Sequence, residues 1–280
     1  GFTEDIKTRF EQLILSSTGM VILNGPSSAG KTTTLYAALQ KIYEMLGQHT
    51  SIITIEDPVE YEIGLFSQIE VNRRANIDFA SCLKAVLRQD PEVIMVGEIR
   101  DSETCHIALQ ASLTGHKVLT TIHAGHSCEV LTRLLEMGIE PYIVASSITG
   151  VLAQRLVRKV CQHCKEPDIL DPKLLTLLAN FVDTDNLLPI HGRGCSQCFQ
   201  TGFQGRLALT ELLTMTEDIR QAVLMKVDTS YLVEIAREKG LRLLLEDGIL
   251  KIKKGLTTVQ EVLRVLGTAF QFSLTKRITR

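Results

Sequence analysis

The segment GPSSAGKT, from Gly25 to Thr32, has the spacing G-x-x-x-x-G-K-[ST] of a loop that binds nucleotide phosphates. In such a loop, successive backbone N–H groups and the N-terminus of the following helix bind the anion. Lys31 would reach the β- and γ-phosphates, and the Thr32 hydroxyl would bind Mg²⁺. A chance glycine-rich turn with an exposed lysine is the alternative. The nucleotide-binding residues that we predict are Gly25, Ser27, Ser28, Ala29, Gly30, Lys31, Thr32 and Thr33.

Carboxylates that could support hydrolysis follow two apolar runs. Glu98 follows the run VIMVG, and a second group, Glu56, Asp57 and Glu60, follows the run SIITI. If the runs are parallel strands, Glu98 lies at the carboxyl edge of the sheet, where ligands gather, and could hold Mg²⁺ through water or polarise the attacking water. Three carboxylates at one strand end repel one another, so their presence together indicates either a bound cation that offsets the repulsion or a function that requires them. A solvated glutamate and a solvated acidic loop are the alternatives.

Two histidines, His116 and His123, flank the apolar run 118–122. Beside a phosphate site, such a pair could sense the γ-phosphate. Packed or surface histidines without a role are the alternative.

The seven cysteines are unevenly distributed. Four of them form two C-x-x-C pairs that are 30 residues apart and could hold one structural Zn²⁺ in a tetrahedral site: Cys161, Cys164, Cys195 and Cys198. Two disulfides would need an oxidising compartment, and a redox C-x-x-C would need only one pair. His163 and His191 are expected to be spectators. The other cysteines are expected to be small apolar fillers: Cys82, Cys105 and Cys128.

The composition is that of a folded chain with one or two domains. Of its 280 residues, 45% are hydrophobic and 22% are charged, which excludes disordered and low-complexity classes. The formal net charge of −2 gives no overall positive field, so we expect no nucleic-acid partner. No apolar run approaches the roughly 18 residues of a membrane span, and the start GFTEDIKTRF is too polar for a signal peptide. These features predict a soluble chain in a reducing cytosol.

The predicted elements form an α/β scaffold. Short apolar runs at 20–23, 51–55, 93–96 and 118–122 alternate with helical patterns, which indicates parallel βαβ units. The first helix is expected over 31–46. We predict a nucleotide-binding core at 1–160, a tetracysteine zinc-binding insert at 161–204 and a mainly helical subdomain at 205–280.

The last subdomain is expected to begin with a strand at 206–213. Helices should follow at 217–226, 230–239 and 241–254, and Thr257 with Gln260 has the capping-box spacing that opens a further helix. Within the insert, one helix is expected from Pro172 to Asn180.

Ordered motifs resemble those of the secretion and pilus assembly ATPases, the motors of bacterial type II secretion and type IV pilus assembly. The motifs are GPSSAGKTTTLY, TIEDPVEY, LRQDPEVIMVGEIRD, ASLTGHKVLTTIHA and GVLAQRLVRKVCQHC, followed by the second C-x-x-C pair. The resemblance implies a P-loop NTPase core of the RecA type with a mostly parallel sheet. Pilus retraction motors generally lack the four cysteines, so the cysteines favour the assembly and secretion branch. ASLTGH and SSITGVLAQRLVR favour type II secretion over type IV pilus assembly.

The resemblance also implies roles for individual residues. Lys31 belongs to the Walker A loop, and Glu98 is the Walker B glutamate. Glu60 of the acidic box is the expected activator of water, with Glu56 and Asp57 in support.

Further implied roles involve histidines, arginines and partners. His116 and His123 match the histidine box, and Arg88 and Arg100 would contact phosphates or a neighbouring subunit. Family members are hexameric rings at the cytoplasmic face of the inner membrane, where hydrolysis drives pseudopilus assembly. The N-terminal domains that dock on membrane platform proteins are missing here, so we expect a fragment with weak ATPase activity in isolation.

Four positions depart from the family pattern. Ser28 stands where many relatives have glycine, Ala124 and Gly125 replace the usual Thr-Asn, and Lys117 stands where an apolar residue is common. The altered histidine box alone favours a competing hypothesis, a regulatory or scaffolding subunit that binds ATP and hardly hydrolyses it. A nucleic-acid translocase with a zinc ribbon would predict basic residues with interleaved aromatics around the cysteines, and the insert offers few of them.

Overall fold

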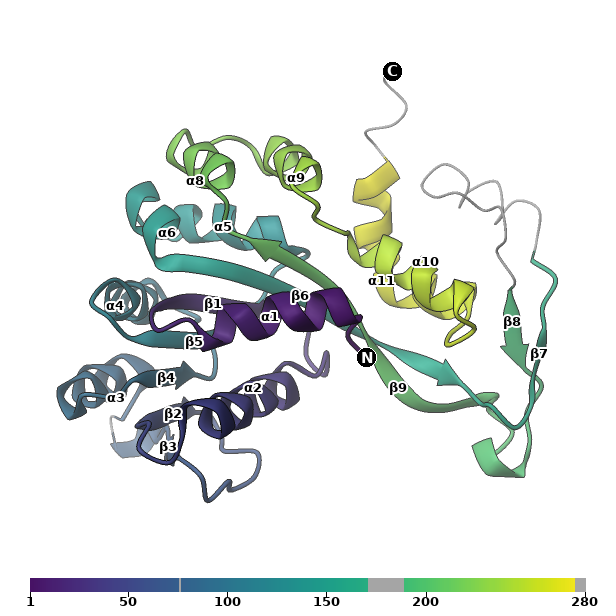
Figure 1. Ribbon diagram of the computed structural model, residues 1–280, viewed down its shortest axis with the longest axis horizontal. Coiled ribbons are helices and arrows are strands. Elements are labelled where there is room, and N and C mark those ends of the chain that lie inside the picture. The colour runs from purple at the N-terminus through teal and green to yellow at the C-terminus, as the bar shows by residue number, and fades with distance from the viewer. Residues whose placement is uncertain (76, 171–188, 275–280) are drawn as a thin grey trace. The chain divides into compact units, whose positions relative to one another are not determined.

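The computed structural model describes residues 1–75, 77–170 and 189–274. These residues form two compact units (Figure 1). The first, which we call the core unit, comprises Thr3–Ala153 and Leu212–Leu241, and the second, which we call the cysteine unit, comprises the rest. Two long strands, β6 (Ile148–Val160) and β9 (Phe203–Thr214), pass from one unit into the other. The predicted division into three segments, at 1–160, 161–204 and 205–280, has other boundaries than these two units and stays a prediction.

A mostly parallel sheet forms the centre of the core unit. Among the described residues, the strand order is β3-β2-β4-β5-β1-β6-β9. The bounds are Gly19–Asn24 for β1, Ile52–Glu56 for β2, Ser67–Glu70 for β3, Val93–Val96 for β4 and Lys117–Ile122 for β5. β1 is parallel to β5 and β6, β2 is parallel to β3 and β4, and β4 is parallel to β5. All residues of β1, β2, β4 and β5 are buried, as expected of parallel strands covered on both faces.

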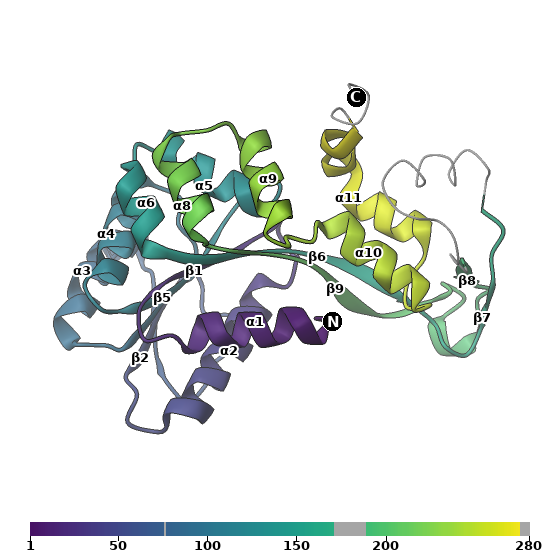
Figure 2. The ribbon, with the colours of Figure 1, turned by 45° about the horizontal axis from the view of Figure 1, so that its top comes forward.

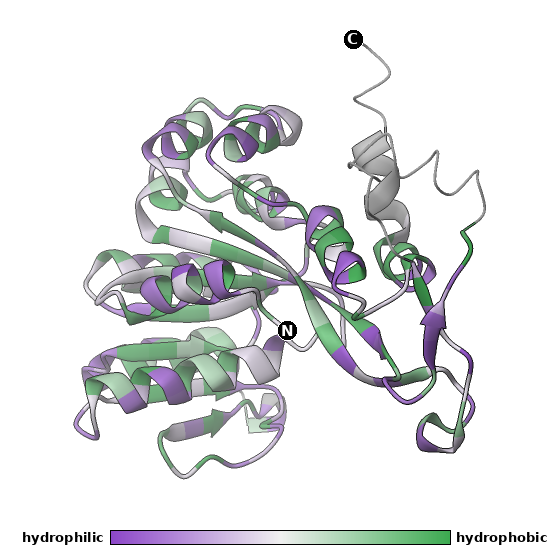
Figure 3. Ribbon diagram, turned by 45° about the vertical axis from the view of Figure 1, so that its right-hand side comes forward, coloured by the Kyte–Doolittle hydropathy of each residue, from purple (hydrophilic) through white to green (hydrophobic). Residues whose placement is uncertain are grey.

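Helices cover both faces of this sheet. α1 (Glu4–Leu15) and α2 (Lys31–Leu46) lie on one face, and α5 (Ser127–Glu136), α6 (Pro141–Ser147), α8 (Glu217–Leu224) and α9 (Thr229–Glu238) lie on the other (Figure 2). α3 (Phe79–Val86) packs on α4 (Ser102–Leu113), which also packs on α6. The strands between these layers are largely hydrophobic, and the helices carry both hydrophilic and hydrophobic residues (Figure 3). The predicted α/β core with a mostly parallel sheet is confirmed.

Over its described residues, the cysteine unit combines a small sheet with two α-helices. β7 (Lys165–Pro167) and β8 (Ile190–Gly192) pair in antiparallel fashion. The helices are α10 (Leu244–Lys253) and α11 (Val259–Leu274).

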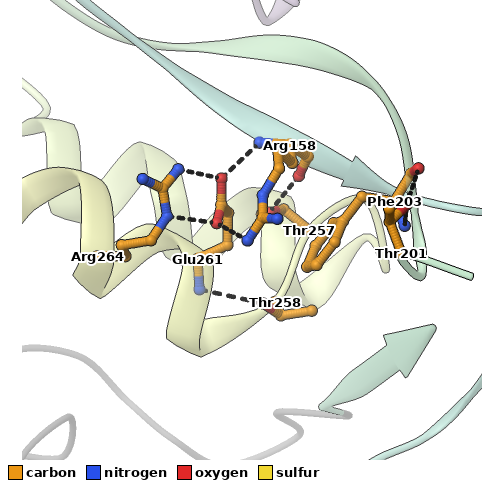
Figure 4. Close-up of polar contacts among 7 residues, drawn as sticks. All are labelled: Arg158, Thr201, Phe203, Thr257, Thr258, Glu261 and Arg264. Carbon is orange, nitrogen blue, oxygen red and sulfur yellow. Dashed lines mark hydrogen bonds and ion pairs between the residues drawn. The ribbon is translucent and has the colours of Figure 1, made fainter. Parts of the chain in front are cut away.

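The buried carboxylate of Glu261 joins α11 to β6 (Figure 4). It accepts hydrogen bonds from the Arg158 backbone at 2.9 Å, from the Arg158 guanidinium at 2.8 Å and from the Arg264 guanidinium at 2.7 and 2.8 Å. The Arg158 guanidinium also lies 4.0 Å from the centroid of the Phe203 ring. Burial opposes the charge on Glu261, but the hydrogen bonds from Arg264 and Arg158 prevail and lower its pKa to about 2.

Apolar runs located most strands of the core unit to within one residue at each end. The predicted helix at 31–46 coincides with α2. The strand predicted at 206–213 lies within β9, which begins three residues earlier and ends one residue later. The sequence did not predict β3, which is half exposed, or β6, in which Gly150 and the pair Gln154 and Arg155 interrupt the apolar pattern.

The C-terminal helices differ from prediction at their ends. The helix predicted from residue 241 begins at Leu244, and α8 ends at Leu224 rather than at residue 226. The predicted cap of the last helix is wrong by one residue: Thr258 Oγ1 accepts the Glu261 N–H at 3.1 Å, whereas Thr257 Oγ1 donates to the Arg158 carbonyl at 2.9 Å. The helix expected from Pro172 to Asn180 lies outside the described residues.

Candidate functional site

The predicted phosphate-binding loop connects β1 to α2 at the carboxyl edge of the sheet. Ser28 (φ +62°) and Gly30 (φ +84°) lie in the left-handed region, where the chain turns into the helix. For a residue with a side chain, this conformation costs about 1–2 kcal/mol, so Ser28 strains the loop where glycine would not. Lys31 Nζ donates to the carbonyls of Gly25 at 2.8 Å and Pro26 at 3.0 Å, which holds the ammonium group at the loop backbone.

The first turn of α2 follows directly. Thr32 is half buried and Thr33 is exposed. The first N–H groups of a helix have no partner within it, so this turn offers donors and a positive dipole end to an anion. The described arrangement is therefore that of an anion-binding loop at a helix N-terminus.

Glu98 lies at the same edge, two residues beyond β4. Gly97 allows a close approach to β2, because a Cβ there would lie 3.2 Å from the Ile55 carbonyl oxygen. Glu98 Oε2 accepts from Arg100 Nη2 at 2.6 Å and from Arg100 Nε at 2.7 Å. The hydrogen bond and the charge of Glu98 raise the pKa of Arg100 above its ordinary value. Arg100 therefore fixes the position of the Glu98 carboxylate at the sheet edge.

His123 connects Glu98 to the phosphate loop. It follows β5, which separates β1 from β4 in the sheet. His123 Nε2 lies 2.9 Å from Glu98 Oε1, and His123 Nδ1 lies 3.0 Å from the Gly25 carbonyl oxygen. Because both partners are acceptors, both contacts are hydrogen bonds when the ring carries two protons. The Gly25 carbonyl oxygen thus contacts both His123 Nδ1 and Lys31 Nζ.

Asn24, which the sequence prediction did not include, holds the turn that carries His123. It is fully buried, and its Nδ2 donates to the carbonyls of Ala124 and His126, both at 3.2 Å. A polar residue at the end of an otherwise apolar strand was the available signal. The amide fastens the segment in which Ala124 and Gly125 replace the expected Thr-Asn.

The structure does not bring His116 to this site. His116 precedes β5, whereas His123 follows it, and Gly19↔Lys117 and Asn24↔Ile122 pair at opposite ends of the parallel ladder. A strand of six residues spans about 20 Å, so His116 lies at the opposite edge of the sheet from the phosphate loop. Its Nδ1 lies 3.0 Å from the Ala111 carbonyl oxygen. A catalytic role for His116 stays a prediction that this chain's geometry does not favour.

The two predicted arginines are separated in the same way. Arg100 contacts Glu98 at the carboxyl edge. Arg88 is exposed in a short helical turn before β4, at the amino edge. Only Arg100 therefore lies at the predicted phosphate site of its own chain.

The acidic box contains one buried and two exposed carboxylates. Glu56, the last residue of β2, is 3% exposed. Its Oε1 accepts from Thr54 Oγ1 at 2.6 Å and from Gln68 Nε2 at 3.1 Å, and its Oε2 accepts from Tyr36 Oη. Burial and the bond to Glu56 raise the pKa of Tyr36.

Asp57 and Glu60 are exposed in the segment that follows β2. Tyr36, Thr54 and Gln68, which fix Glu56, were not predicted, because they are distant in sequence and belong to no motif. The acidic box therefore consists of one buried, hydrogen-bonded carboxylate, that of Glu56, and an exposed loop that carries Asp57 and Glu60.

The four predicted metal ligands meet in the cysteine unit, where their Sγ atoms all lie within 4.8 Å of one another. Cys161–Cys195, Cys164–Cys198 and Cys195–Cys198 are separated by 3.9, 3.8 and 3.7 Å between Sγ atoms. A tetrahedron with Zn–S bonds of about 2.3 Å has edges of about 3.8 Å. A disulfide needs about 2.05 Å, so the spacing fits a shared metal ion and not two disulfides.

The backbone supports charge on this cysteine cluster. Gly194 N donates to Cys164 Sγ at 3.3 Å, and Cys195 N and Gly202 N donate to Cys198 Sγ at 3.2 and 3.3 Å. Burial raises the pKa of Cys164 to about 12, whereas at Cys198 burial is outweighed by the backbone hydrogen bonds, which lower its pKa to about 6. Thiolates are the form that binds metal, so the donor set fits a divalent cation.

A close glycine contact permits this geometry. A Cβ at Gly192 would lie 2.1 Å from the Gly202 carbonyl oxygen, and a Cβ at Gly202 (φ +74°) would lie 2.3 Å from the Gly192 carbonyl oxygen. Any side chain at either position would separate the two halves of the cluster. The remaining cysteines are buried away from it, as predicted for fillers: Cys82, Cys105 and Cys128.

Comparisons with known proteins agree with the motifs. The model of the family described as "Type II/IV secretion system protein" matches residues 1–264. The type II secretion system protein HxcR of Pseudomonas aeruginosa is 44% identical over 265 residues, which are 95% of this chain and 52% of that protein. The type IV pilus assembly ATPase PilB of Thermus thermophilus is 43% identical over 264 residues, which are 94% of this chain and 29% of that protein. The chain spans about half or less of the length of these curated relatives.

Solved structures show the same fold. The pilus retraction motor PilT with bound ADP has a TM-score of 0.67 at 24% identity, over 94% of this chain and 64% of that chain. The ATPase DotB of Legionella pneumophila has a TM-score of 0.66 at 22% identity, over 91% of this chain and 62% of that chain. None of the helices among the described residues is long and apolar enough to cross a bilayer. With a family model that covers nearly the whole chain and the motif geometry described above, the chain belongs to the type II/IV secretion system protein family.

Proposed function

We propose that this chain is the ATP-hydrolysing part of a motor ATPase that powers pseudopilus assembly in type II protein secretion. The observation that carries the proposal is the continuous set of contacts from the phosphate loop through His123 to Glu98 at one edge of the sheet. This set joins an anion-binding loop to a charged carboxylate, the two groups that phosphoryl transfer to water requires.

The proposed roles follow from position. The loop from Gly25 to Thr33 binds the phosphates of ATP, with Lys31 as the cation at the β- and γ-phosphates. Thr32 would hold Mg²⁺, which supplies charge neutralisation of the phosphates when bound. Glu60, exposed in the acidic loop, is the proposed general base for water, and Glu98 orients the site together with His123.

The cysteine cluster is proposed to hold one structural Zn²⁺. Four thiolates fill a tetrahedral shell and leave no open position, so the ion would stabilise the fold and take no part in hydrolysis. The Sγ separations of 3.7–3.9 Å and the three N–H···S bonds support this assignment.

Oligomer, partners and location are also proposals. We expect a homo-oligomer, a hexameric ring, that docks on inner-membrane platform proteins from the cytoplasmic side, mainly through other domains of the full-length protein. The names of the relatives support a secretion or pilus machine. No nucleic-acid partner is proposed, in line with the formal net charge of −2.

A second candidate is a type IV pilus assembly ATPase. It is favoured by the 43% identity to PilB, which is only one percentage point below the 44% identity to HxcR. The neighbouring genes would separate the two, because secretion and pilus operons encode different subunits. A third candidate, a regulatory ATP-binding subunit, is favoured by Ala124 and Gly125 in the histidine box.

Phosphate release from the full-length, oligomeric protein in the presence of Mg²⁺ and ATP tests the proposal. Glu60→Gln should lower the turnover by about 100-fold or more, the usual effect of losing a general base. Glu62→Gln is the matched control, since Glu62 is exposed on the same loop and has no proposed role.

Binding of a fluorescent ATP analogue, with Lys31→Ala as the control, is measured in parallel. Analogue binding without phosphate release above the Glu60→Gln level would contradict the motor and support the regulatory candidate. If Lys31→Ala retains both analogue binding and phosphate release, the proposed phosphate loop is contradicted.

A further inference from the structure

Tyr36 lies where the phosphate-binding helix meets the acidic loop. It is on α2, five residues after Lys31, which is about 7.5 Å along the helix axis. The side chain is 2% exposed, and its hydroxyl donates to Glu56 Oε2. A tyrosine in this position joins two elements that are distant in sequence and both belong to the proposed site.

Glu56 is in turn fully engaged inside the protein. Thr54 Oγ1 at 2.6 Å and Gln68 Nε2 at 3.1 Å donate to Oε1, and Tyr36 donates to Oε2. A buried carboxylate is costly unless hydrogen bonds satisfy it, and here each oxygen has a donor from the chain. Glu56 is therefore built as an anchor between α2, β2 and β3.

The same cluster holds the backbone of the acidic loop. The Glu60 backbone interacts with the Tyr36 phenol and opposes the rise of its pKa. The Tyr61 ring packs edge-on against the Tyr36 ring, with 4.7 Å between centroids and an interplanar angle of 88°. Gln68 accepts from Ile63 N at 2.6 Å and donates to the Tyr61 carbonyl at 3.3 Å.

A further anchor lies on β3. Glu70 Oε2 accepts from Val59 N at 3.0 Å, directly before Glu60. The exposed carboxylate of Glu60 thus projects from a backbone that is held on both sides, while its own side chain remains available at the surface.

We propose that Tyr36 and Glu56 are positioning residues that hold the Glu60 loop in register with the phosphate-binding helix. The expected effect on ATP turnover rests on the proposed function. The expected effect on the backbone of the Glu60 loop rests on the described contacts alone. It assigns Glu56 to positioning Glu60 and removes it from the groups that act on ATP. In this proposal, Tyr36 on α2 keeps the distance between the phosphate loop and the proposed base Glu60 constant.

The first test is kinetic. Tyr36→Phe retains the ring and removes only the hydroxyl, so we expect kcat to fall by about 10- to 100-fold, the effect of a displaced catalytic group. KM for ATP should stay within about threefold, because the phosphate loop is untouched. Tyr43→Phe, the same change seven residues further along α2, is the matched control and should match the wild type.

Glu56→Gln tests the same link from the other side and should also lower kcat with little change in KM. The double variant with Tyr36→Phe should lose no more than the stronger single variant, because Glu56→Gln already disturbs the hydrogen bond that Tyr36→Phe removes. Additive losses would overturn the link, as would a kcat within twofold of the wild type in Tyr36→Phe. Equal changes in kcat and KM would indicate a general structural effect and also overturn it.

Hydrogen–deuterium exchange tests the positioning without any enzymatic activity. Backbone amides at Glu60 and Ile63 should exchange at least about tenfold faster in Tyr36→Phe than in Tyr43→Phe, because Glu60 interacts with the Tyr36 phenol and Ile63 N is bound by Gln68, which also contacts Glu56. The thermal midpoint should fall by about 2–8 °C because a buried oxygen of Glu56 loses its donor. Unchanged exchange at these amides would overturn the proposal.

Failure of the proposed function looks different. If the wild-type chain releases no more phosphate than Glu60→Gln, hydrolysis by Glu60 is refuted, and the exchange result still decides whether Tyr36 positions the loop.

Discussion

Removal of the charge on Glu261 should destabilise the cysteine unit measurably. In the folded chain, this carboxylate is 1% exposed and accepts four hydrogen bonds from Arg158 and Arg264. Its pKa is lowered from the ordinary 4.5 to about 2, burial acting against the shift and the arginine hydrogen bonds causing it. At about 1.36 kcal/mol per pKa unit, the shift corresponds to about 3.4 kcal/mol.

Screening reduces this figure. The side chains of Arg158 and Arg264 are 47% and 59% exposed, so water competes for both guanidinium groups. We therefore expect Glu261→Gln to lower the free energy of unfolding by about 2 kcal/mol at pH 7. Urea denaturation followed by circular dichroism measures the difference.

The contribution of Glu261 to stability depends on pH. The folded-state pKa of Glu261 lies below the unfolded value, so between these values the unfolded chain binds more protons, and acid destabilises the fold. The stabilisation is fully present above about pH 5 and is lost as the pH falls towards 2. The gap between wild type and Glu261→Gln should therefore shrink from pH 5 downward and be about halved near pH 3.

Glu103→Gln is the matched control. Glu103 pairs with Lys84 at 2.6 Å, but the two side chains are 63% and 57% exposed. Exposed ion pairs contribute little, so this variant should lose less than about 0.5 kcal/mol. An equally small loss in Glu261→Gln at pH 7, or a gap that is constant from pH 7 to pH 3, would refute the reasoning.

Three further outcomes are expected. Elemental analysis of protein purified under reducing, chelator-free conditions should find about one zinc per chain, which Cys198→Ser loses and Cys105→Ser keeps; a wild type without zinc would contradict the site. Ser28→Gly should raise the thermal midpoint by about 2–4 °C because it relieves the left-handed strain of the phosphate loop, and a lower midpoint would show that the serine contributes a compensating contact. Burial lowers the pKa of Lys117 to about 8, below the unfolded value, so wild-type stability should rise with pH between about 8 and 10.5. Lys117→Met should remove that rise in urea denaturation, and an identical pH dependence in both chains would disprove it.

The core fold was predictable because its signals are local. Four strands are runs of apolar residues buried on both faces, and the phosphate loop is a contiguous motif between a strand and a helix. β6 was not predictable in this way, because Gln154 and Arg155 interrupt its pattern and are buried only through the rest of the fold.

The candidate site was predictable in part. Lys31, Glu98 and His123 meet as their positions after β1, β4 and β5 imply. His116 does not join them, because flanking a strand places two residues at opposite ends of it. Asn24 carries no motif, and its role arises from two carbonyls about 100 residues away.

The sequence by itself determined the chemistry of this protein. The types and spacing of the phosphate loop, the acidic box and the four cysteines specify which groups are available, since each motif is short enough for the local chain to set its geometry. Only the tertiary structure decided which groups act together. Tyr36, Glu56 and Gln68 come from three elements that meet only when α2, β2 and β3 pack, and that packing makes one carboxylate an anchor and leaves its neighbour exposed.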